Sequence, residues 1–171
     1  MKIKVRHTAG FSLVEVTLAL AVTAFCLVVI FGLLPVGLNS NQNSIQQTAA
    51  ANIARAIISD LRATQISIPA STRSTMFRIP IPPPGVGSAF RTLFLREDGS
   101  TGTTRIGSNA DPTQNPRYRA TIYFTPPAAG QRTATTLRIL ITWPAMADRI
   151  ATSQPGAYTG SYEISTTLDR N

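Results

Sequence analysis

Apolar residues follow three successive patterns along the chain, and the first is an uninterrupted run. From Val16 to Leu38 no residue carries a charge. As an α-helix this run would extend for about 35 Å, because each residue adds about 1.5 Å along the axis. The hydrocarbon core of a bilayer is about 30 Å thick. The run therefore predicts a helix that is long enough to cross a membrane.

An amphipathic pattern follows the apolar run. Its apolar residues recur with a period close to four, at Ile45, Ala49, Ala50, Ile53, Ala54, Ile57, Ile58 and Leu61. Polar residues occupy the other side, at Gln47, Arg55, Ser59 and Arg62. This spacing predicts that the helix continues and buries one stripe. Pro69 cannot continue a helix and restricts Ile68 before it, so we expect the helix to end near Gln65–Ile68.

In the third pattern the period is two. This alternation predicts four half-buried β-strands, over 92–96, 118–124, 137–143 and 162–168. The strands are separated by short turn-forming segments, at 97–100, 126–130 and 154–156. Loops this short favour antiparallel hairpins. Residues 80–87 read P-I-P-P-P-G-V-G and predict a rigid extended connector.

Together these patterns predict an α+β fold. One long N-terminal helix, with a transmembrane half and an amphipathic half, is expected to pack on a small antiparallel sheet. The chain has 171 residues, which is enough for one domain and a membrane anchor.

Charges at the start of the chain orient the predicted membrane helix. Lys2, Lys4 and Arg6 precede the apolar run, and after Glu15 the next charged residue is Arg55. The positive-inside rule therefore places the N-terminus in the cytoplasm and the C-terminal part outside. A secretory signal peptide has an apolar core of only about 7–15 residues. The longer run here disfavours that interpretation, whereas a plain signal anchor stays open.

Glu15 is the acidic residue closest to the apolar run. A carboxylate at this depth is costly and is a functional candidate by default. Residues Ser12–Glu15 also fit the S-x-x-E capping box, in which both side chains satisfy the first helical N–H groups. The positive end of the helix dipole would favour the carboxylate as well. The residues alone support capping and partner binding equally.

The residues before the apolar run form a recognisable motif. Residues Lys4–Glu15 read K-V-R-H-T-A-G-F-S-L-V-E, with a basic leader, Gly10, Phe11 and then Glu15. Followed by an apolar helix, this segment resembles the class III signal of type IV prepilins and type II secretion pseudopilins. The resemblance implies that a prepilin peptidase cleaves between Gly10 and Phe11 and that Phe11 is N-methylated. It also implies that Glu15 pairs with the Phe11 amine of a neighbouring subunit.

Helix-weakening residues lie late in the apolar run, at Gly32, Pro35 and Gly37. Inside a helix, Pro costs about 3 kcal/mol and Gly about 1 kcal/mol relative to Ala. We expect the helix to kink or loosen here. Two readings stay open, a simple exit from the membrane and, through the resemblance, a segment that melts when subunits pack into a filament.

Two shorter segments carry narrower resemblances. Residues Gly32–Ser40 are similar to the Verru_Chthon cassette protein B family, a group of pilin-like proteins. The predicted strand that ends at Trp143-Pro144 resembles the PilV and GspI groups of minor pilins and pseudopilins.

The motif and the patterns divide the chain into three parts. These are a leader at 1–10, a transmembrane or filament-core helix at 11–38, and a globular domain with the helix continuation at 39–171. The resemblance implies a minor pilin or pseudopilin whose partners are prepilin peptidase, other subunits and the inner membrane. It further implies a single-pass protein with a periplasmic C-terminal domain, which then enters a periplasmic or extracellular filament.

The charge balance leaves one alternative open. The chain has 16 basic and 8 acidic residues, a net charge of +8. Removing Lys2, Lys4 and Arg6 with the leader leaves 13 basic and 8 acidic residues, or +5. A moderate excess is typical of a solvated surface. It is also compatible with a membrane-anchored adhesin or DNA-uptake pilin that binds nucleic acid through an arginine-rich outer face.

Residue types that carry catalysis are scarce in the predicted domain. Cys26 is the only cysteine, which excludes an intrachain disulfide. The only histidine, His7, lies in the predicted leader, which removes most triad and zinc hypotheses for the folded part. The acidic residues are scattered, and residues 97–101 contain only two carboxylates, which predicts a turn and not a calcium loop. We therefore expect a non-enzymatic protein without a metal or another cofactor.

Overall fold

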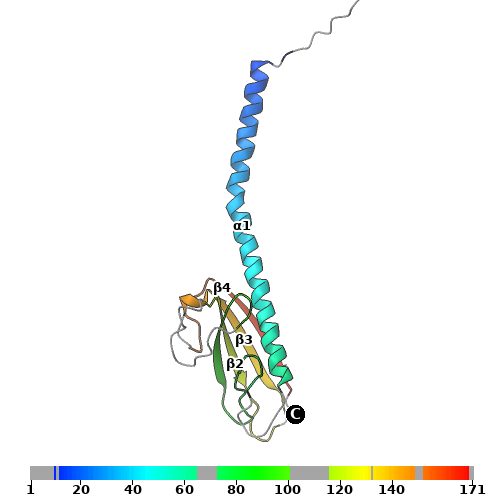
Figure 1. The fold of residues 1–171 in the computed structure, drawn as a ribbon, viewed down its shortest axis with the longest axis vertical. Helices are drawn as coiled ribbons and strands as arrows, with labels where there is room; N and C mark the ends of the chain where they lie inside the picture. The colour runs from blue at the N-terminus through cyan, green and yellow to red at the C-terminus, as the bar shows by residue number, and fades with distance from the viewer. Residues whose placement is uncertain are drawn as a thin grey trace, which may run out of the picture. The chain divides into compact units, whose positions relative to one another are not determined.

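The protein folds into a long helix and an antiparallel sheet, as seen in a computed structural model (Figure 1). The structure describes residues 10, 12–64, 73–100, 116–131, 133–148 and 152–169. The elements in chain order are α1 (Leu13–Ala63), β1 (Ala89–Leu95), β2 (Tyr118–Thr125), β3 (Thr135–Trp143), the 3₁₀-helix η2 (Ala145–Ala147) and β4 (Gly160–Leu168). The chain divides into two compact units, Met1–Gln42 and Asn43–Asn171.

The first unit contains the apolar part of α1. Every side chain described between Ser12 and Gln42 is exposed. Two hydroxyls within it are satisfied inside the helix, because Thr17 donates to the Val14 carbonyl and Thr23 to the Ala19 carbonyl, at 2.9 and 2.7 Å. α1 is long and apolar enough to cross a membrane.

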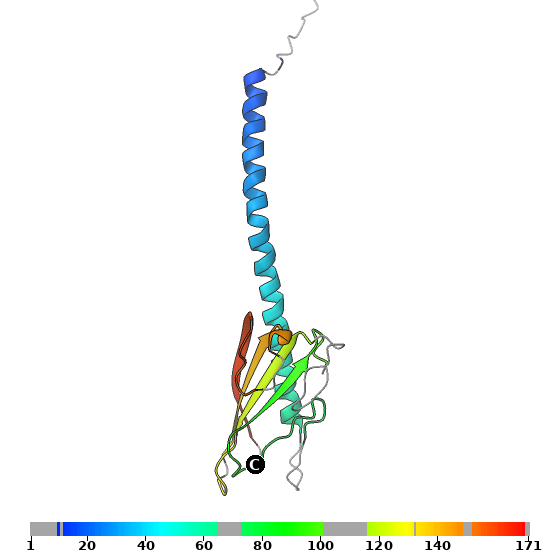
Figure 2. The same ribbon diagram turned by 90° about the vertical axis from the view of Figure 1, so that its left-hand side faces the viewer.

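In the second unit the remainder of α1 lies along one face of the sheet (Figures 1 and 2). The strands pair antiparallel in chain order, β1-β2-β3-β4. Alternate strand residues point toward α1, and the core contains Ile53, Ala54, Ile57, Leu61, Leu93, Leu95, Tyr118, Ala120, Ile122, Phe124, Leu137, Ile139 and Ile141. The predicted α+β fold and the four predicted strands are therefore confirmed.

Several boundaries differ from the prediction, and β1 in particular spans Ala89–Leu95 where 92–96 was expected. Ile45 is 53% exposed, because burial against the sheet begins only near Ala50. α1 ends at Ala63, and the Thr64 hydroxyl donates to the Asp60 carbonyl at 2.7 Å in the last turn. β4 begins at Gly160, which pairs with Trp143 so closely that a Cβ there would overlap the indole ring.

Asp60 has a structural role that the sequence did not reveal. Its carboxylate accepts hydrogen bonds from the backbone N–H groups of Met76 and Phe77, at 2.9 and 3.0 Å. These residues belong to a tight turn, residues 73–80, which we call the anchored turn. The turn is closed by the Ser74 N–H donating to the Ile79 carbonyl and by the Ile79 N–H donating to the Ser74 hydroxyl. Asp60 thus holds the anchored turn against α1.

Replacing Asp60 should destabilise the second unit. In Asp60→Ala one buried and one partly buried N–H group lose their acceptor, so we expect the free energy of unfolding to fall by about 2 kcal/mol. Urea unfolding of the full chain in a neutral detergent would measure this through the fluorescence of Trp143, the only tryptophan. Ser59→Ala, at the exposed neighbouring position, is the control. Equal midpoints for the two variants would contradict the assigned role.

Candidate functional site

The predicted cleavage motif is only partly within the described residues. Gly10 is exposed, and no atom lies within 4 Å of the position that a Cβ would take. Phe11 lies outside the described residues. Glu15 lies in the first turn of α1. Cleavage, N-methylation and subunit pairing therefore stay predictions.

The first turn of α1 begins with backbone hydrogen bonds. The N–H groups of Glu15 and Val16 donate to the Ser12 carbonyl at 2.9 and 3.1 Å. Between the described residues Ser12 and Glu15, the two side-chain bonds of a capping box are not formed. In this arrangement the Glu15 carboxylate is not committed to capping its own helix.

α1 runs without interruption through the residues predicted to weaken it. Gly32, Pro35 and Gly37 are all helical and exposed. The loss of one backbone hydrogen bond at Pro35 is thus accommodated within the helix. The expected kink stays a prediction, as does melting of this segment on assembly.

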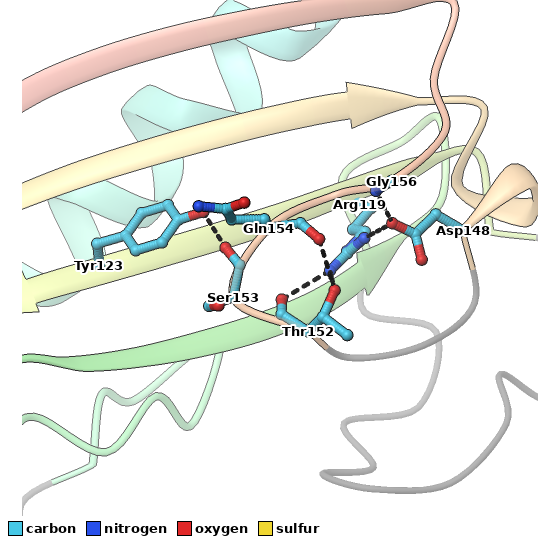
Figure 3. Close-up of polar contacts among 7 residues, drawn as sticks. All are labelled: Arg119, Tyr123, Asp148, Thr152, Ser153, Gln154 and Gly156. Atoms are coloured by element: carbon cyan, nitrogen blue, oxygen red, sulfur yellow. Dashed lines mark hydrogen bonds and ion pairs between the residues drawn. The ribbon is translucent and has the colours of Figure 1, made fainter.

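The sequence did not reveal a polar cluster on the outer face of the sheet, the face opposite α1 (Figure 3). The Arg119 side chain projects from β2 and is fully buried. Its guanidinium forms an ion pair with Asp148 and donates to the carbonyl of Thr152 at 2.8 Å. The Gly156 N–H donates to the same Asp148 carboxylate at 2.6 Å. One buried arginine therefore binds Asp148 and Thr152, two residues within the chain segment that joins β3 to β4.

One apolar contact and two further hydrogen bonds also attach this segment to the sheet. Phe94 lies beside Arg119 in the β1–β2 register and packs against Ala145 of η2. The Ala145 N–H also donates to the Arg117 carbonyl at 2.9 Å. Further along the segment the Tyr123 hydroxyl donates to the Ser153 carbonyl (Figure 3). The β3–β4 connection thus lies across the outer face of β2.

This attachment corrects two predictions. The turn predicted at 154–156 is part of a connection over 144–159, so β3 and β4 are not joined by a short hairpin. The prediction of a half-buried strand over 118–124 is wrong at Arg119 and Thr121, which are both fully buried. Alternating polar residues normally mark a face that is exposed to solvent. Here a segment distant in sequence covers that face, and the residues of the strand itself carry no signal of it.

Other arginines lie in exposed ion pairs. Arg138 pairs with Glu163, with 2.6 Å between Nε and Oε1, and lies over the Tyr123 ring. The hydrogen bond from Arg138 holds the pKa of Glu163 below its usual value. Arg117 pairs with Glu97, with 3.5 Å between Nη1 and Oε2. Because acids are paired with these two arginines, Arg138 and Arg117 give the predicted arginine-rich face no additional support.

The turn predicted after β1 is confirmed. The Gly99 N–H donates to the Arg96 carbonyl at 3.1 Å, and Gly99 has a φ of 78°. The hydroxyl and N–H of Ser100 donate to the Asp98 carboxylate, which lowers the pKa of Asp98. Within the described ranges, no group of three or more His, Cys, Asp or Glu residues is placed to hold a metal ion.

Two cavities in the second unit are lined by described residues. One, of about 640 Å³, lies between α1 and β4, where Arg62 donates to the Thr166 hydroxyl at 2.9 Å. The other, of about 330 Å³, lies between the anchored turn and β1. Comparisons of the chain with protein-family models, curated proteins and solved structures gave no match.

Breaking the buried ion pair should be far more damaging than breaking an exposed one. Asp148→Ala leaves the buried Arg119 guanidinium without its carboxylate, so we expect a loss of about 3–5 kcal/mol in the free energy of unfolding. Glu163→Ala should cause a small loss, because solvent screens its pairing with Arg138. Urea unfolding followed by Trp143 fluorescence measures both.

A double variant separates loss of the pair from loss of side-chain volume. Arg119→Met combined with Asp148→Leu should recover most of the stability, since apolar residues of similar volume often replace a buried pair at little cost. If Asp148→Ala is no less stable than Glu163→Ala, Arg119 does not fasten the connection.

Proposed function

We propose that the protein is a structural subunit, a minor pilin or pseudopilin, of a type IV pilus-like filament or a type II secretion pseudopilus. The proposal rests on the residues at the start of the chain. A basic leader and the Gly10-Phe11 step precede α1, Glu15 lies in its first turn, and the apolar side chains that follow, up to Leu38, are exposed. On this proposal the subunit first spans the inner membrane, with its C-terminal domain in the periplasm, and then enters the filament.

The exposed surface of α1 requires an apolar environment. Large side chains such as Leu13, Phe25 and Val28 are each 70% exposed or more. Water disfavours apolar surface in proportion to its area, so continuous exposure along a helix indicates lipid or other helices as neighbours. A lipid bilayer and a bundle of identical helices both meet this requirement.

Glu15 distinguishes these two environments. An unpaired carboxylate is costly in an apolar surrounding, and Glu15 has no side-chain partner among the described residues. A lipid anchor alone would leave that cost in place. A neighbouring helix that carries a positive amine near its own start would remove it and set the register between the two helices.

The proposed processing step creates such an amine. Hydrolysis of the Gly10–Phe11 peptide bond consumes one water molecule and leaves a carboxylate on Gly10 and an amine on Phe11. The amine binds a proton and becomes positive. The leader departs with Lys2, Lys4 and Arg6, so the mature helix begins with one positive group four residues before Glu15. Cleavage and assembly are chemically linked in this way.

The mature N-terminus tests the processing step. In a host with a prepilin peptidase we expect mass spectrometry to find a chain that starts at N-methylated Phe11. Gly10→Val should leave the leader in place, because the side chain hinders approach of the protease to the backbone. Thr8→Ala is the control and should be processed normally. An intact Met1 start, or cleavage near Ala21, would rule the proposal out.

Glu15 tests the assembly step. Glu15→Gln removes the charge but keeps the shape, and we expect membrane insertion to persist while incorporation into filaments falls by about tenfold or more. Cross-linking and electron microscopy of sheared filaments measure incorporation. Thr23→Val is the matched control in the same helix, because the Thr23 hydroxyl bonds only to its own helix. Wild-type incorporation of Glu15→Gln would contradict pairing.

A further inference from the structure

Three arginines surround the cavity between the anchored turn and β1. Arg73 and Arg78 lie on the anchored turn, and Arg91 lies on β1. The other described residues that line the cavity are uncharged, namely Ile79, Pro80, Thr92 and Leu93. The lining therefore carries three positive charges and no carboxylate.

The fold holds the backbone of the turn that carries Arg73 and Arg78, whose side chains are exposed. Asp60 and Ser74 fasten the anchored turn, and Phe77 and Ile79 are buried in the core at 2% and 1% exposure. Arg78 has a φ of 51°, in the left-handed region that a residue other than glycine rarely adopts. Such a conformation persists only where the surroundings impose it, and it is frequent at ligand sites.

One donor of the cavity lining has no partner. The Nε of Arg91 is buried and has no hydrogen-bond partner among the described residues, whereas its Nη1 donates to the Phe90 carbonyl at 2.8 Å. Within the same part of the chain, neither Arg73 nor Arg78 forms an ion pair. A buried donor without an acceptor is costly, and nearby guanidinium groups repel one another. An acceptor-rich anion in the cavity would relieve both costs.

We propose that this cavity binds the phosphate group of a small phosphate monoester. A phosphate dianion offers only acceptors, and guanidinium groups bind it through paired N–H donors. Two negative charges match three arginines better than the single charge of a carboxylate. The volume of about 330 Å³ lies at the lower end of the range for small-molecule sites and leaves room for a short organic group. This inference does not depend on the proposed filament function.

Calorimetry of the full chain in an uncharged detergent at low ionic strength tests this site. The probes are inorganic phosphate, glycerol 3-phosphate and a short single-stranded oligonucleotide. We expect glycerol 3-phosphate to bind, and inorganic phosphate to compete with it. Arg78→Asn should weaken glycerol 3-phosphate binding by about tenfold or more, because a charge-assisted hydrogen bond is lost while asparagine tolerates the left-handed backbone.

Two further variants control for folding and for net charge. Arg73→Gln also removes a guanidinium from the cavity and should weaken binding in the same direction. Arg55→Asn removes an exposed arginine that lies outside this cavity and should change the affinity by less than about twofold. Each variant should match the wild-type unfolding midpoint in the absence of phosphate.

The outcomes distinguish a specific phosphate site from nonspecific attraction of anions to the positively charged surface. Binding that is lost in the cavity variants and kept in Arg55→Asn supports the proposal. The absence of glycerol 3-phosphate binding overturns it, as does equal weakening by Arg55→Asn. Binding of the oligonucleotide without glycerol 3-phosphate also overturns it and indicates a surface that attracts polyanions.

Discussion

The second half of α1 is packed against one face of the sheet, and the arrangement of the globular unit depends on this contact. Ile57 of α1 and Ile122 and Ile139 of the sheet are completely buried there. Burial of each such side chain contributes about 1.5–3 kcal/mol. Asp60 lies on the same turns of α1, so its hold on residues 73–80 depends on the same packing. The positions of Arg73 and Arg78, which lie on the anchored turn, therefore depend on this packing as well.

The two faces of the sheet are stabilised by different physics. Toward α1 the contacts are almost entirely apolar, whereas on the outer face a buried arginine fastens the β3–β4 connection. A buried ion pair adds little net stability to a fold, but removing one of its two partners is strongly destabilising. Arg119 therefore specifies where the connection lies more than it strengthens the fold. The three arginines around the smaller cavity are in a different situation, because Arg73 and Arg78 are exposed and Arg91 is partly buried, and the described lining offers them no carboxylate.

Regular periods in the sequence predicted most of the secondary structure. A spacing near four predicted the stripe of α1, and alternation predicted the strands, because each period reflects local backbone geometry. The prediction was wrong where burial depends on segments far apart in the chain. Ile45 continues the stripe but extends beyond the sheet, and Arg119 continues the alternation but is covered by a segment about 30 residues away.

The sequence by itself determined the length of the apolar helix, the antiparallel α+β fold and the motif from Lys4 to Glu15, because these depend on residue types at short, regular spacings. Only the tertiary structure decided which polar residues are buried and what they hold. Asp60 reaches Met76 and Phe77, and Arg119 reaches Asp148, across distances along the chain that no periodicity encodes. The cavity with Arg73, Arg78 and Arg91 exists for the same reason. Folding brings together charges that are isolated in sequence, and burial then makes their pairing, or its absence, energetically significant.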